Sequence, residues 1–221
     1  TLGFVLAALL LATFIQFAAP WLVGYDGHFH ITFSTLLREQ GWLDALPWLS
    51  FTIHAEEYRN HHLLFNYLLA LFTFGDPTFG GKVAAVTFFG LLALALFYLY
   101  HRLAVPYPAV LALLTLTASA PFLYRMSMVR VQSLSLALLL LIFYFAWRRN
   151  GWVLALLSMV FVWLYDAFPL VLAIGGAFLV SAWVTEHRLD WRPFAAIIAG
   201  IVLGLVINPY FPENIGSIGY N

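Results

Sequence analysis

The chain of 221 residues contains no cysteine, and only 9% of its residues are charged. The absence of cysteine excludes disulfide frameworks, thiolate metal sites and thiol nucleophiles, so any chemistry comes from Asp, Glu, His, Arg and Asn side chains. The scarcity of charge excludes an ordinary soluble domain, in which roughly one quarter of the residues are charged. Ten basic residues balance ten acidic ones, so the net charge gives no indication of a nucleic-acid partner.

Hydrophobic residues make up 63% of the chain, and several runs reach the roughly 20 residues needed to cross a bilayer core of about 30 Å. We therefore expect an all-α, multi-pass integral membrane protein, a helix bundle with about seven spanning helices. Charged residues, Gly and Pro set the limits of each span. The expected spans are residues 3–24, 82–101, 106–123, 131–147, 151–165, 168–185 and 192–208.

One transmembrane domain is expected over residues 1–221, and its first helix leads into a long external loop at residues 25–62. A short apolar segment within residues 63–75 covers only about 18 Å at 1.5 Å per residue, so we expect a re-entrant or tilted helix there. The remaining helices occupy residues 82–208, and an external tail follows at residues 209–221. The chain lacks an initiating Met and ends in an apparently unfinished loop, so we expect it to be a fragment.

The long loop contains an amphipathic pattern. Ile31, Phe33, Leu36 and Leu37 recur with approximately helical spacing, while residues 38–40 are polar. This pattern predicts a helix that lies in the membrane interface.

The number of spans assigns the polar segments to two sides of the membrane if every long run crosses once. The short basic segments at residues 101–103, 148–150 and 186–192 then share the side that we take as cytoplasmic. The candidate site residues fall on the other side, so an active site is expected on the extracytoplasmic face.

The first candidate group is Asp26, His28 and His30, with Arg38 further along the same segment. Asp26 could act as a general base or bind a metal ion, with a histidine or Arg38 binding an anionic group. A helix cap, in which the carboxylate accepts backbone hydrogen bonds, is the simpler alternative for Asp26.

The second candidate group lies in HAEEYRNHHLLF, where Glu56, Glu57, Arg59, His61 and His62 precede an apolar helix. Carboxylates and imidazoles bind divalent cations, and charges held at a membrane surface attract anionic substrates. A solvated loop without a site is the alternative.

The third group is Arg125 and Arg130 in PFLYRMSMVRVQSLS, together with Asp166 in WLYDAFP. Arg130 could simply extend its charge to the interface, and Asp166 could cap a helix. An acid between two apolar helices is nevertheless costly, which makes Asp166 a functional candidate. A pocket that gathers all three groups would suit a lipid-linked phosphate whose leaving group needs cationic stabilisation.

Four segments resemble the GT-C superfamily of polyprenyl-phosphate-dependent glycosyltransferases, which includes the catalytic subunit of oligosaccharyltransferase, the protein mannosyltransferases and the aminoarabinose transferases. The first is similar to that family's first loop, with an acid, then aromatic residues or His, then an Arg before a Gly–aromatic pair. The segments are YDGHFHITFSTLLREQGW, NHHLLFNYLLALFTFGD, YRMSMVR and INPYFPEN.

The resemblance implies an inverting transfer of a sugar from a polyprenyl phosphate or pyrophosphate to an acceptor of unknown identity. It implies that Asp26 is catalytic or binds a divalent cation, Mg or Mn, with Glu56 or Glu57 as the later acid and Glu57 as the second metal ligand. Asp166 is a further candidate. The remaining candidates are expected to bind the substrate phosphate: His28, His30, Arg38, His61, His62, Arg125 and Arg130.

Other classes stay open. A degenerate transferase could serve as a non-catalytic subunit of a larger membrane complex, with partner subunits. A haem or chlorophyll carrier would need histidines between helices, but all seven fall in loops or at helix ends, so neither cofactor is expected. A transporter would show broken helices and charges near the bilayer midplane. The centres of the expected spans are nearly uncharged, so a transporter is disfavoured.

Overall fold

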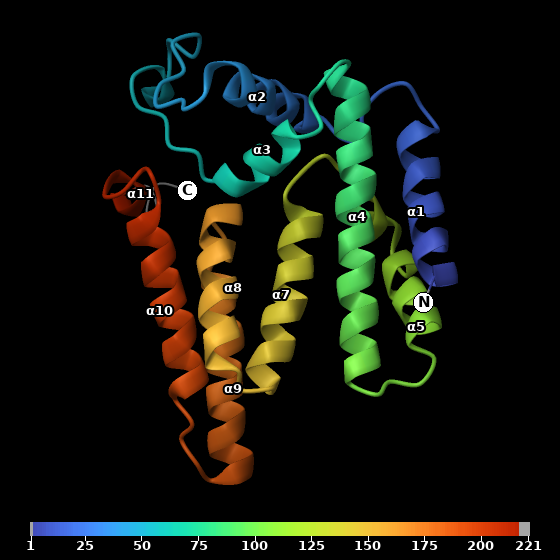
Figure 1. Ribbon diagram of the computed structural model, residues 1–221, viewed down its shortest axis with the longest axis vertical. Coiled ribbons are helices and arrows are strands. Elements are labelled where there is room, and N and C mark those ends of the chain that lie inside the picture. The colour runs from blue at the N-terminus through green and yellow to red at the C-terminus, as the bar shows by residue number, and fades with distance from the viewer. Residues whose placement is uncertain (1, 217–221) are drawn as a thin grey trace. The chain divides into compact units, whose positions relative to one another are not determined.

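The computed structural model describes residues 2–216, and every regular element within them is a helix (Figure 1). This confirms the all-α class, while residues 217–221 of the expected tail lie outside the described residues. The elements are α1 Leu2–Phe17, α2 Gly27–Gln40, η1 Ile53–Ala55, α3 Leu63–Ala70, α4 Pro77–Arg102, α5 Pro108–Thr117, α6 Ala120–Met126, α7 Gln132–Trp147, α8 Gly151–Leu164, α9 Pro169–Glu186, α10 Arg192–Ile207 and α11 Glu213–Gly216.

Two compact units make up the chain. Unit 1 comprises Thr1–Glu39 and Phe65–Leu141, and unit 2 comprises Gln40–Leu64 and Ile142–Asn221. The expected first external loop therefore divides between the units. Asp26 belongs to unit 1, whereas the HAEEYRNHH segment belongs to unit 2, and each unit is described by itself below.

Two helices are long and apolar enough to span a membrane, α4 with 26 residues and α9 with 18. A third span results if α5 and α6, which meet at a bend of 93°, form one broken span. Helices α1, α7, α8 and α10 are apolar but shorter, and the 16 residues of α1 cover about 24 Å. The helices in residues 2–216 are thus compatible with a membrane protein, and the seven spans stay a prediction.

The first helix ends at Phe17 rather than at residue 24. Pro20 lies inside the apolar run, and its ring disfavours helical backbone angles at the preceding residue. Gly24 has a φ of +82°, a left-handed conformation in which glycine is favoured. Hydropathy extends through both of these breaks, which is why the sequence places the end of the helix too late.

The span expected at residues 106–123 is divided into α5 and α6. Ser119 has an extended backbone, with φ −140° and ψ 123°, and therefore interrupts the helix. Pro121 lies in the first turn of α6, where its missing N–H costs no helical hydrogen bond. A single apolar run therefore contains two helices.

Helix α4 begins at Pro77 rather than at residue 82 because Asp76 caps it. The Asp76 carboxylate accepts hydrogen bonds from the backbone N–H groups of Thr78 at 2.8 Å and Phe79 at 3.3 Å. These bonds satisfy two of the amides that a helix N-terminus leaves without a partner.

Helix α2 is the amphipathic helix expected in the long loop. Its residues Ile31, Phe33 and Leu37 are buried, while Glu39 is exposed. Leu36 is partly buried, so the helix and the burial of its apolar residues are confirmed, while its position in the membrane interface stays a prediction.

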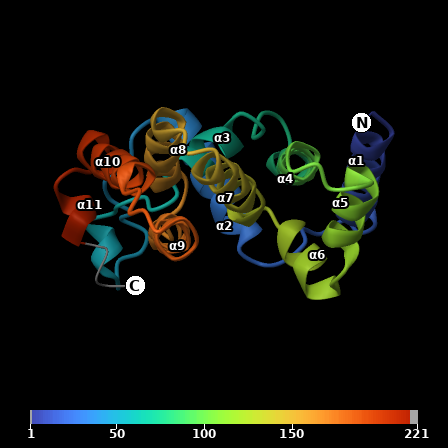
Figure 2. The same ribbon diagram turned by 90° about the horizontal axis from the view of Figure 1, so that it is seen from below.

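The core of unit 1 forms where α1, α4 and α5 pack together (Figure 2). Helix α1 buries Phe4, Ala8 and Ala12, which lie four residues apart and share one face. The small Ala side chains allow a close approach to α4, and a Cβ on Gly90 of α4 would lie 2.7 Å from Leu9 Cδ2. Other α1 residues expose large hydrophobic side chains: Leu2, Leu6, Leu10 and Phe14.

Unit 2 is built on close packing between α8 and α10. A Cβ on Gly200 would lie 2.1 Å from the Ala155 carbonyl oxygen, and one on Gly204 would lie 2.9 Å from the Met159 carbonyl oxygen. The Trp163 indole N–H donates a 2.8 Å hydrogen bond to the Gly204 carbonyl. Small residues spaced by four are typical of apolar helices that pack backbone to backbone. This contact fixes the positions of the C-terminal ends of α8 and α10, and the polar residues Asp166 and Asn208 follow those ends.

Candidate functional site

Asp26 and Arg130 form an ion pair in unit 1, with Arg130 Nη1 2.7 Å from Asp26 Oδ2. Asp26 immediately precedes α2, and Arg130 lies between α6 and α7. The exposed fraction is 57% for the Asp26 side chain and 35% for that of Arg130, so both can contact a bound molecule. The pair joins two segments that the sequence marks separately, the first loop and the YRMSMVR turn.

Close packing of two turns brings this pair together. A Cβ on Gly24 would lie 2.9 Å from Met128 Cε, and one on Gly27 would lie 3.2 Å from Val129 Cβ. Glycine at both positions therefore leaves room for the turn that carries Arg130.

Buried polar side chains hold the end of α1 beside the pair. The Gln16 amide donates a hydrogen bond to the Ser127 carbonyl, and Lys82 Nζ donates one of 2.5 Å to the Ala19 carbonyl. Gln16 and Lys82 are 1% and 5% exposed. Both bonds satisfy backbone oxygens that no helix pairs, so they fix the turn that leads to Asp26.

The two histidines near Asp26 have different surroundings. His28 is exposed, whereas His30 is only 6% exposed, with its Nδ1 3.3 Å from the Asn66 side-chain oxygen. The His30 ring also packs edge-on against Phe65, with 5.1 Å between ring centroids. His30 therefore lies on the buried face of α2, and its contact with a substrate phosphate stays a prediction.

Arg38 makes several contacts within unit 1. Its guanidinium donates hydrogen bonds to the Thr73 carbonyl and, at 3.3 Å, to the Thr73 hydroxyl. It also pairs with Glu39 at 2.9 Å and lies 4.6 Å from the ring centroid of Phe74. These contacts anchor α2 to the turn after α3, so the geometry favours a structural role over the expected phosphate contact.

We expect Arg38→Gln to lower the free energy of unfolding by about 1–3 kcal/mol, because hydrogen bonds from a charged donor are lost. Chemical unfolding of the purified protein in detergent measures this change. Arg125→Gln is the matched control, because Arg125 is exposed in the last turn of α6 and its substitution should stay within about 0.5 kcal/mol. Equal stability of both variants would contradict an anchoring role for Arg38.

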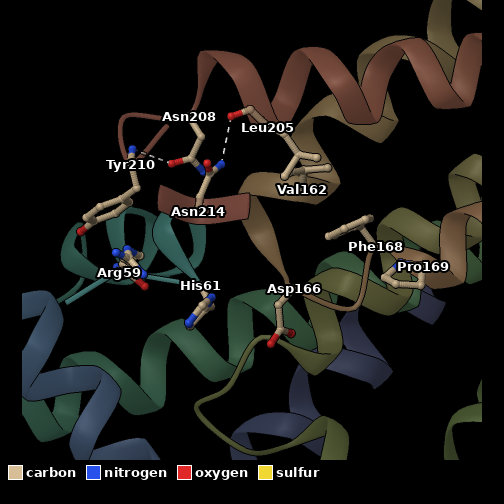
Figure 3. A pocket seen from close by; sticks show the side chains of 11 residues that line it. Arg59, His61, Val162, Asp166, Phe168, Pro169, Leu205, Asn208, Tyr210 and Asn214 are labelled. Carbon is tan, nitrogen blue, oxygen red and sulfur yellow. Dashed lines mark hydrogen bonds between the residues drawn. The ribbon is translucent and has the colours of Figure 1, made fainter. Parts of the chain in front are cut away.

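A pocket of about 140 Å³ lies in unit 2, where α8 and α10 end and α9 begins (Figure 3). Its apolar lining is Val162, Phe168, Pro169 and Leu205. Its polar lining is Arg59, Asn60, His61, Asp166, Asn208, Tyr210 and Asn214. The pocket therefore combines both signs of charge with amides and an aromatic ring.

Hydrogen bonds hold the part of the pocket that follows α10. The Asn208 side-chain oxygen accepts a 3.0 Å bond from the Tyr210 backbone N–H, and the Tyr210 hydroxyl donates one of 2.8 Å to the Leu43 carbonyl. The Asn214 amide donates a 2.9 Å bond to the Leu205 carbonyl. Local bonds of this kind keep the pocket wall in one geometry.

His61 and Asp166 are neighbours in this pocket (Figure 3). Burial lowers the pKa of His61 from its ordinary 6.5, Asp166 raises it, and His54 and Arg59 lower it further. The imidazole is therefore neutral at pH 7, with one nitrogen as donor and the other as acceptor. The N-cap of α9 is Phe168, so Asp166 is not the cap of that helix.

This pKa predicts a pH dependence of stability. The folded pKa of His61 lies below 6.5, so the unfolded chain binds the proton more readily. The stabilising contribution is fully present above pH 6.5 and is lost as the pH falls through the folded pKa. We expect His61→Gln to lose less stability than the wild type between pH 7 and pH 5, as measured by chemical unfolding at each pH. An equal loss of unfolding free energy in both proteins would contradict the lowered pKa of His61.

The acids of the second group lie at the surface of unit 2. Glu56 is exposed, and Glu57 pairs with Arg59 at 2.9 Å. The His62 ring lies against Tyr165, with 5.3 Å between ring centroids. Within this group, therefore, only Arg59 and His61 line the pocket with Asp166, whereas Glu56, Glu57 and His62 do not.

The metal site expected at Asp26 and Glu57 requires several donor side chains close together. Within residues 2–216, no group of three or more His, Asp and Glu side chains is placed to hold a metal ion. Asp26 pairs with Arg130, Glu57 pairs with Arg59, and the two acids belong to different units. Neither unit by itself therefore brings Asp26 and Glu57 together, and the divalent cation stays a prediction to which no chemical step is assigned.

Several pocket residues are not among the candidate site residues predicted from the sequence, although Asn208 and Tyr210 belong to the segment INPYFPEN. Asn208 and Tyr210 immediately follow α10, and Phe168 follows Asp166 by two positions. Their signal was available, since amides and aromatic residues at the end of an apolar helix are typical of an interface. Only the fold brings them together with Arg59 and the other residues that precede α3.

No protein-family model, curated protein or solved structure matches this chain. Two groups of its own side chains therefore carry the functional proposal: Asp26 with Arg130 in unit 1, and the pocket in unit 2.

Proposed function

We propose that this chain is a membrane glycosyltransferase of the GT-C type. It transfers a sugar from a polyprenyl phosphate or pyrophosphate to an acceptor on the extracytoplasmic side, with inversion of configuration. The observation that carries the proposal is the 2.7 Å contact between Asp26 and Arg130. It supports the proposal because the resemblance marks the two segments independently, and their side chains meet.

The pair has the chemistry that this transfer needs. An acceptor hydroxyl attacks the anomeric carbon of the sugar while its proton passes to the Asp26 carboxylate. The bond between the anomeric carbon and the phosphate oxygen breaks, and its electron pair stays on the phosphate. Arg130 then stabilises the phosphate by exchanging its ion pair with Asp26 for one with the leaving group.

The proposal includes seven membrane spans and an external active site. Exposed apolar residues of α10 support contact with lipid: Ile198, Val202, Leu203, Val206 and Ile207. Asp166 follows α8 at one end. At the other end, basic residues lie in the turn before α8, in the turn before α10 and at the first position of α10: Arg148, Arg149, Arg188 and Arg192. Because basic residues favour the cytoplasmic side, this distribution supports an external position for the pocket end of unit 2.

The proposal is tested with purified chain in liposomes that contain a polyprenyl phosphate carrying a labelled sugar. We expect loss of label from the lipid and release of free polyprenyl phosphate when saccharide, peptide or lipid acceptors are supplied. Protein-free liposomes give the background. An intact donor with every acceptor, together with stoichiometric partner proteins in the purified sample, would overturn the proposal and favour a non-catalytic subunit.

A further inference from the structure

A second pocket lies in unit 2, at the end where α7 and α9 finish and α10 begins. Its volume is about 220 Å³. The turns at residues 148–150 and 187–191, which contribute to the lining, lie at this end of the helices (Figure 1). The lining includes one base, two acids and three aromatic rings: Arg149, Glu186, Asp190, Trp147, Phe178 and Phe194.

The charged side chains of this lining have a net charge of −1, because one positive charge meets two negative ones. Arg149 forms ion pairs with Glu186 and, at 3.3 Å, with Asp190. A carboxylate offers about four acceptor positions, so both acids can accept further hydrogen bonds beside those from Arg149. The Asp190 side chain is only 24% exposed, which places part of the negative charge inside the pocket. The lining therefore favours a cationic group with several N–H donors.

Basic side chains lie next to the lining in the chain. Arg148 precedes Arg149, and Arg188 lies between Glu186 and Asp190. Arg148 and Arg188 are both exposed. Arginine binds phosphate through charge-assisted hydrogen bonds, and it repels a ligand that carries only positive charge. A ligand with an ammonium group followed by a phosphate therefore matches both the acidic lining and its basic surroundings.

Four exposed tryptophans indicate that this end of unit 2 lies at the depth of the lipid headgroups, because tryptophan is enriched at membrane–water interfaces. Helix α9, which ends here, is long and apolar enough to span a membrane. The tryptophans lie at the end of α7, the start of α8, the last turn of α9 and just before α10: Trp147, Trp152, Trp183 and Trp191. A ligand with an ammonium and a phosphate at this depth is a phospholipid headgroup.

An exposed apolar face leads away from the pocket along α7. Phe143 and Trp147 lie four residues apart and share this face, with exposed fractions of 41% and 49%. Trp147 lines the pocket, and the Phe143 ring packs against the lining residue Phe178, with 5.2 Å between ring centroids. The acyl chain of a lipid whose headgroup occupies the pocket can therefore lie on α7.

The volume of the pocket suits an aminoethyl headgroup. A water molecule takes about 30 Å³ in the liquid, so 220 Å³ corresponds to roughly seven waters. An ethanolamine group is a chain of one nitrogen, two carbons and one oxygen, and it fits together with several waters.

We propose that this pocket binds the headgroup of an ethanolamine phospholipid. Its ammonium donates hydrogen bonds to Glu186 and Asp190, its phosphate lies near Arg148 or Arg188, and an acyl chain covers the exposed face of α7. This lipid is a bound component of the membrane rather than a substrate. The inference goes beyond sugar transfer and does not depend on it.

The test titrates the purified full chain in detergent with phospholipids that share the same acyl chains, and native mass spectrometry measures the bound lipid. The series runs from phosphatidylethanolamine through its N-methyl and N,N-dimethyl forms to phosphatidylcholine, so the charge is constant while the N–H donors fall to none. We expect the affinity to decrease along the series by about tenfold or more, since hydrogen bonds between charged groups are lost. Equal or tighter binding of phosphatidylcholine would overturn the inference.

Two substitutions in one ion pair separate recognition from general damage to the fold. Asp190→Asn changes the net charge of the lining from −1 to 0 and should weaken phosphatidylethanolamine binding by about tenfold. Arg149→Gln changes it to −2 and should strengthen binding. Both variants break the pair between Arg149 and Asp190, so a purely structural role predicts changes in the same direction. Such a result would overturn the assignment.

Glu213→Gln is the matched control, because it removes an exposed acid beyond the other end of α10. It should leave lipid binding unchanged. A loss equal to that of Asp190→Asn would mean that the net charge of the chain, rather than this pocket, attracts the lipid, and would overturn the inference.

Free ethanolamine distinguishes a lipid from a soluble amine. It lacks the acyl chains, so it should bind at least about tenfold more weakly than the lipid. Equal affinity would assign the pocket to a soluble amine and overturn the lipid. Selective lipid binding without sugar transfer would leave this inference standing and overturn only the proposed function, while transfer without lipid selectivity would do the reverse.

Discussion

Asp26→Asn is expected to slow sugar transfer by about 10²- to 10⁴-fold, which is the usual contribution of a general base. The amide keeps the size of the carboxylate but does not accept the proton of the acceptor hydroxyl. Its hydrogen bond to Arg130 is weaker than the 2.7 Å ion pair, so Arg130 stays available to the leaving phosphate. The loss should therefore appear in kcat rather than in the donor KM, as measured with labelled lipid-linked sugar.

Glu39→Gln is the matched control for this variant. Glu39 is on the helix that Asp26 precedes, its side chain has the same exposed fraction of 57%, and it also pairs with an arginine, Arg38 at 2.9 Å. It should retain nearly full activity. Equal losses in the two variants would point to a general effect of charge at α2, and full activity in Asp26→Asn would exclude the proposed base.

Gly200→Ala is expected to lower the free energy of unfolding by about 3 kcal/mol, because overpacking in a close contact costs up to that amount. The new methyl group would lie 2.1 Å from the Ala155 carbonyl oxygen, an atom of the α8 backbone that cannot rotate away. Helices α8 and α10 must separate to relieve this clash. The change is measured by chemical unfolding in detergent.

Gly176→Ala makes the same substitution on α9, where the added Cβ meets nothing within 4 Å. Alanine favours a helix over glycine by up to about 1 kcal/mol, so this variant should be as stable as the wild type or more stable. The two substitutions thus have opposite expected signs. Destabilisation of both to a similar extent would mean that the α8–α10 contact is not the cause.

Long apolar runs with clear boundaries could be located from the sequence. Residues 192–208 were expected as a helix and α10 spans Arg192–Ile207, while residues 151–165 were expected and α8 spans Gly151–Leu164. Where a proline lies inside an apolar run, at Pro20 and Pro121, the expected helix was too long or undivided. Hydropathy measures how favourably a residue transfers into lipid, whereas proline interrupts a helix through its backbone geometry. A hydropathy pattern therefore does not reveal where proline ends or divides a helix.

The candidate site could be predicted only as separate residues. Asp26 and Arg130 were both identified, but their pairing depends on the close approach that Gly24 and Gly27 permit, which has no local signal. The sequence marks His30 only as a polar residue, whereas its position on α2 places it on the buried face. Burial is a property of packing between distant segments, and a single sequence does not contain it.

The anomeric configuration of the product tests the central claim most directly. Purified chain is supplied with a polyprenyl phosphate that carries a sugar of one defined anomer, and the product is analysed by NMR. Direct displacement by an acceptor that Asp26 deprotonates predicts the opposite anomer, with one free polyprenyl phosphate released for each sugar transferred. A product with the donor's configuration, or no transfer from any polyprenyl-linked sugar, would contradict the account.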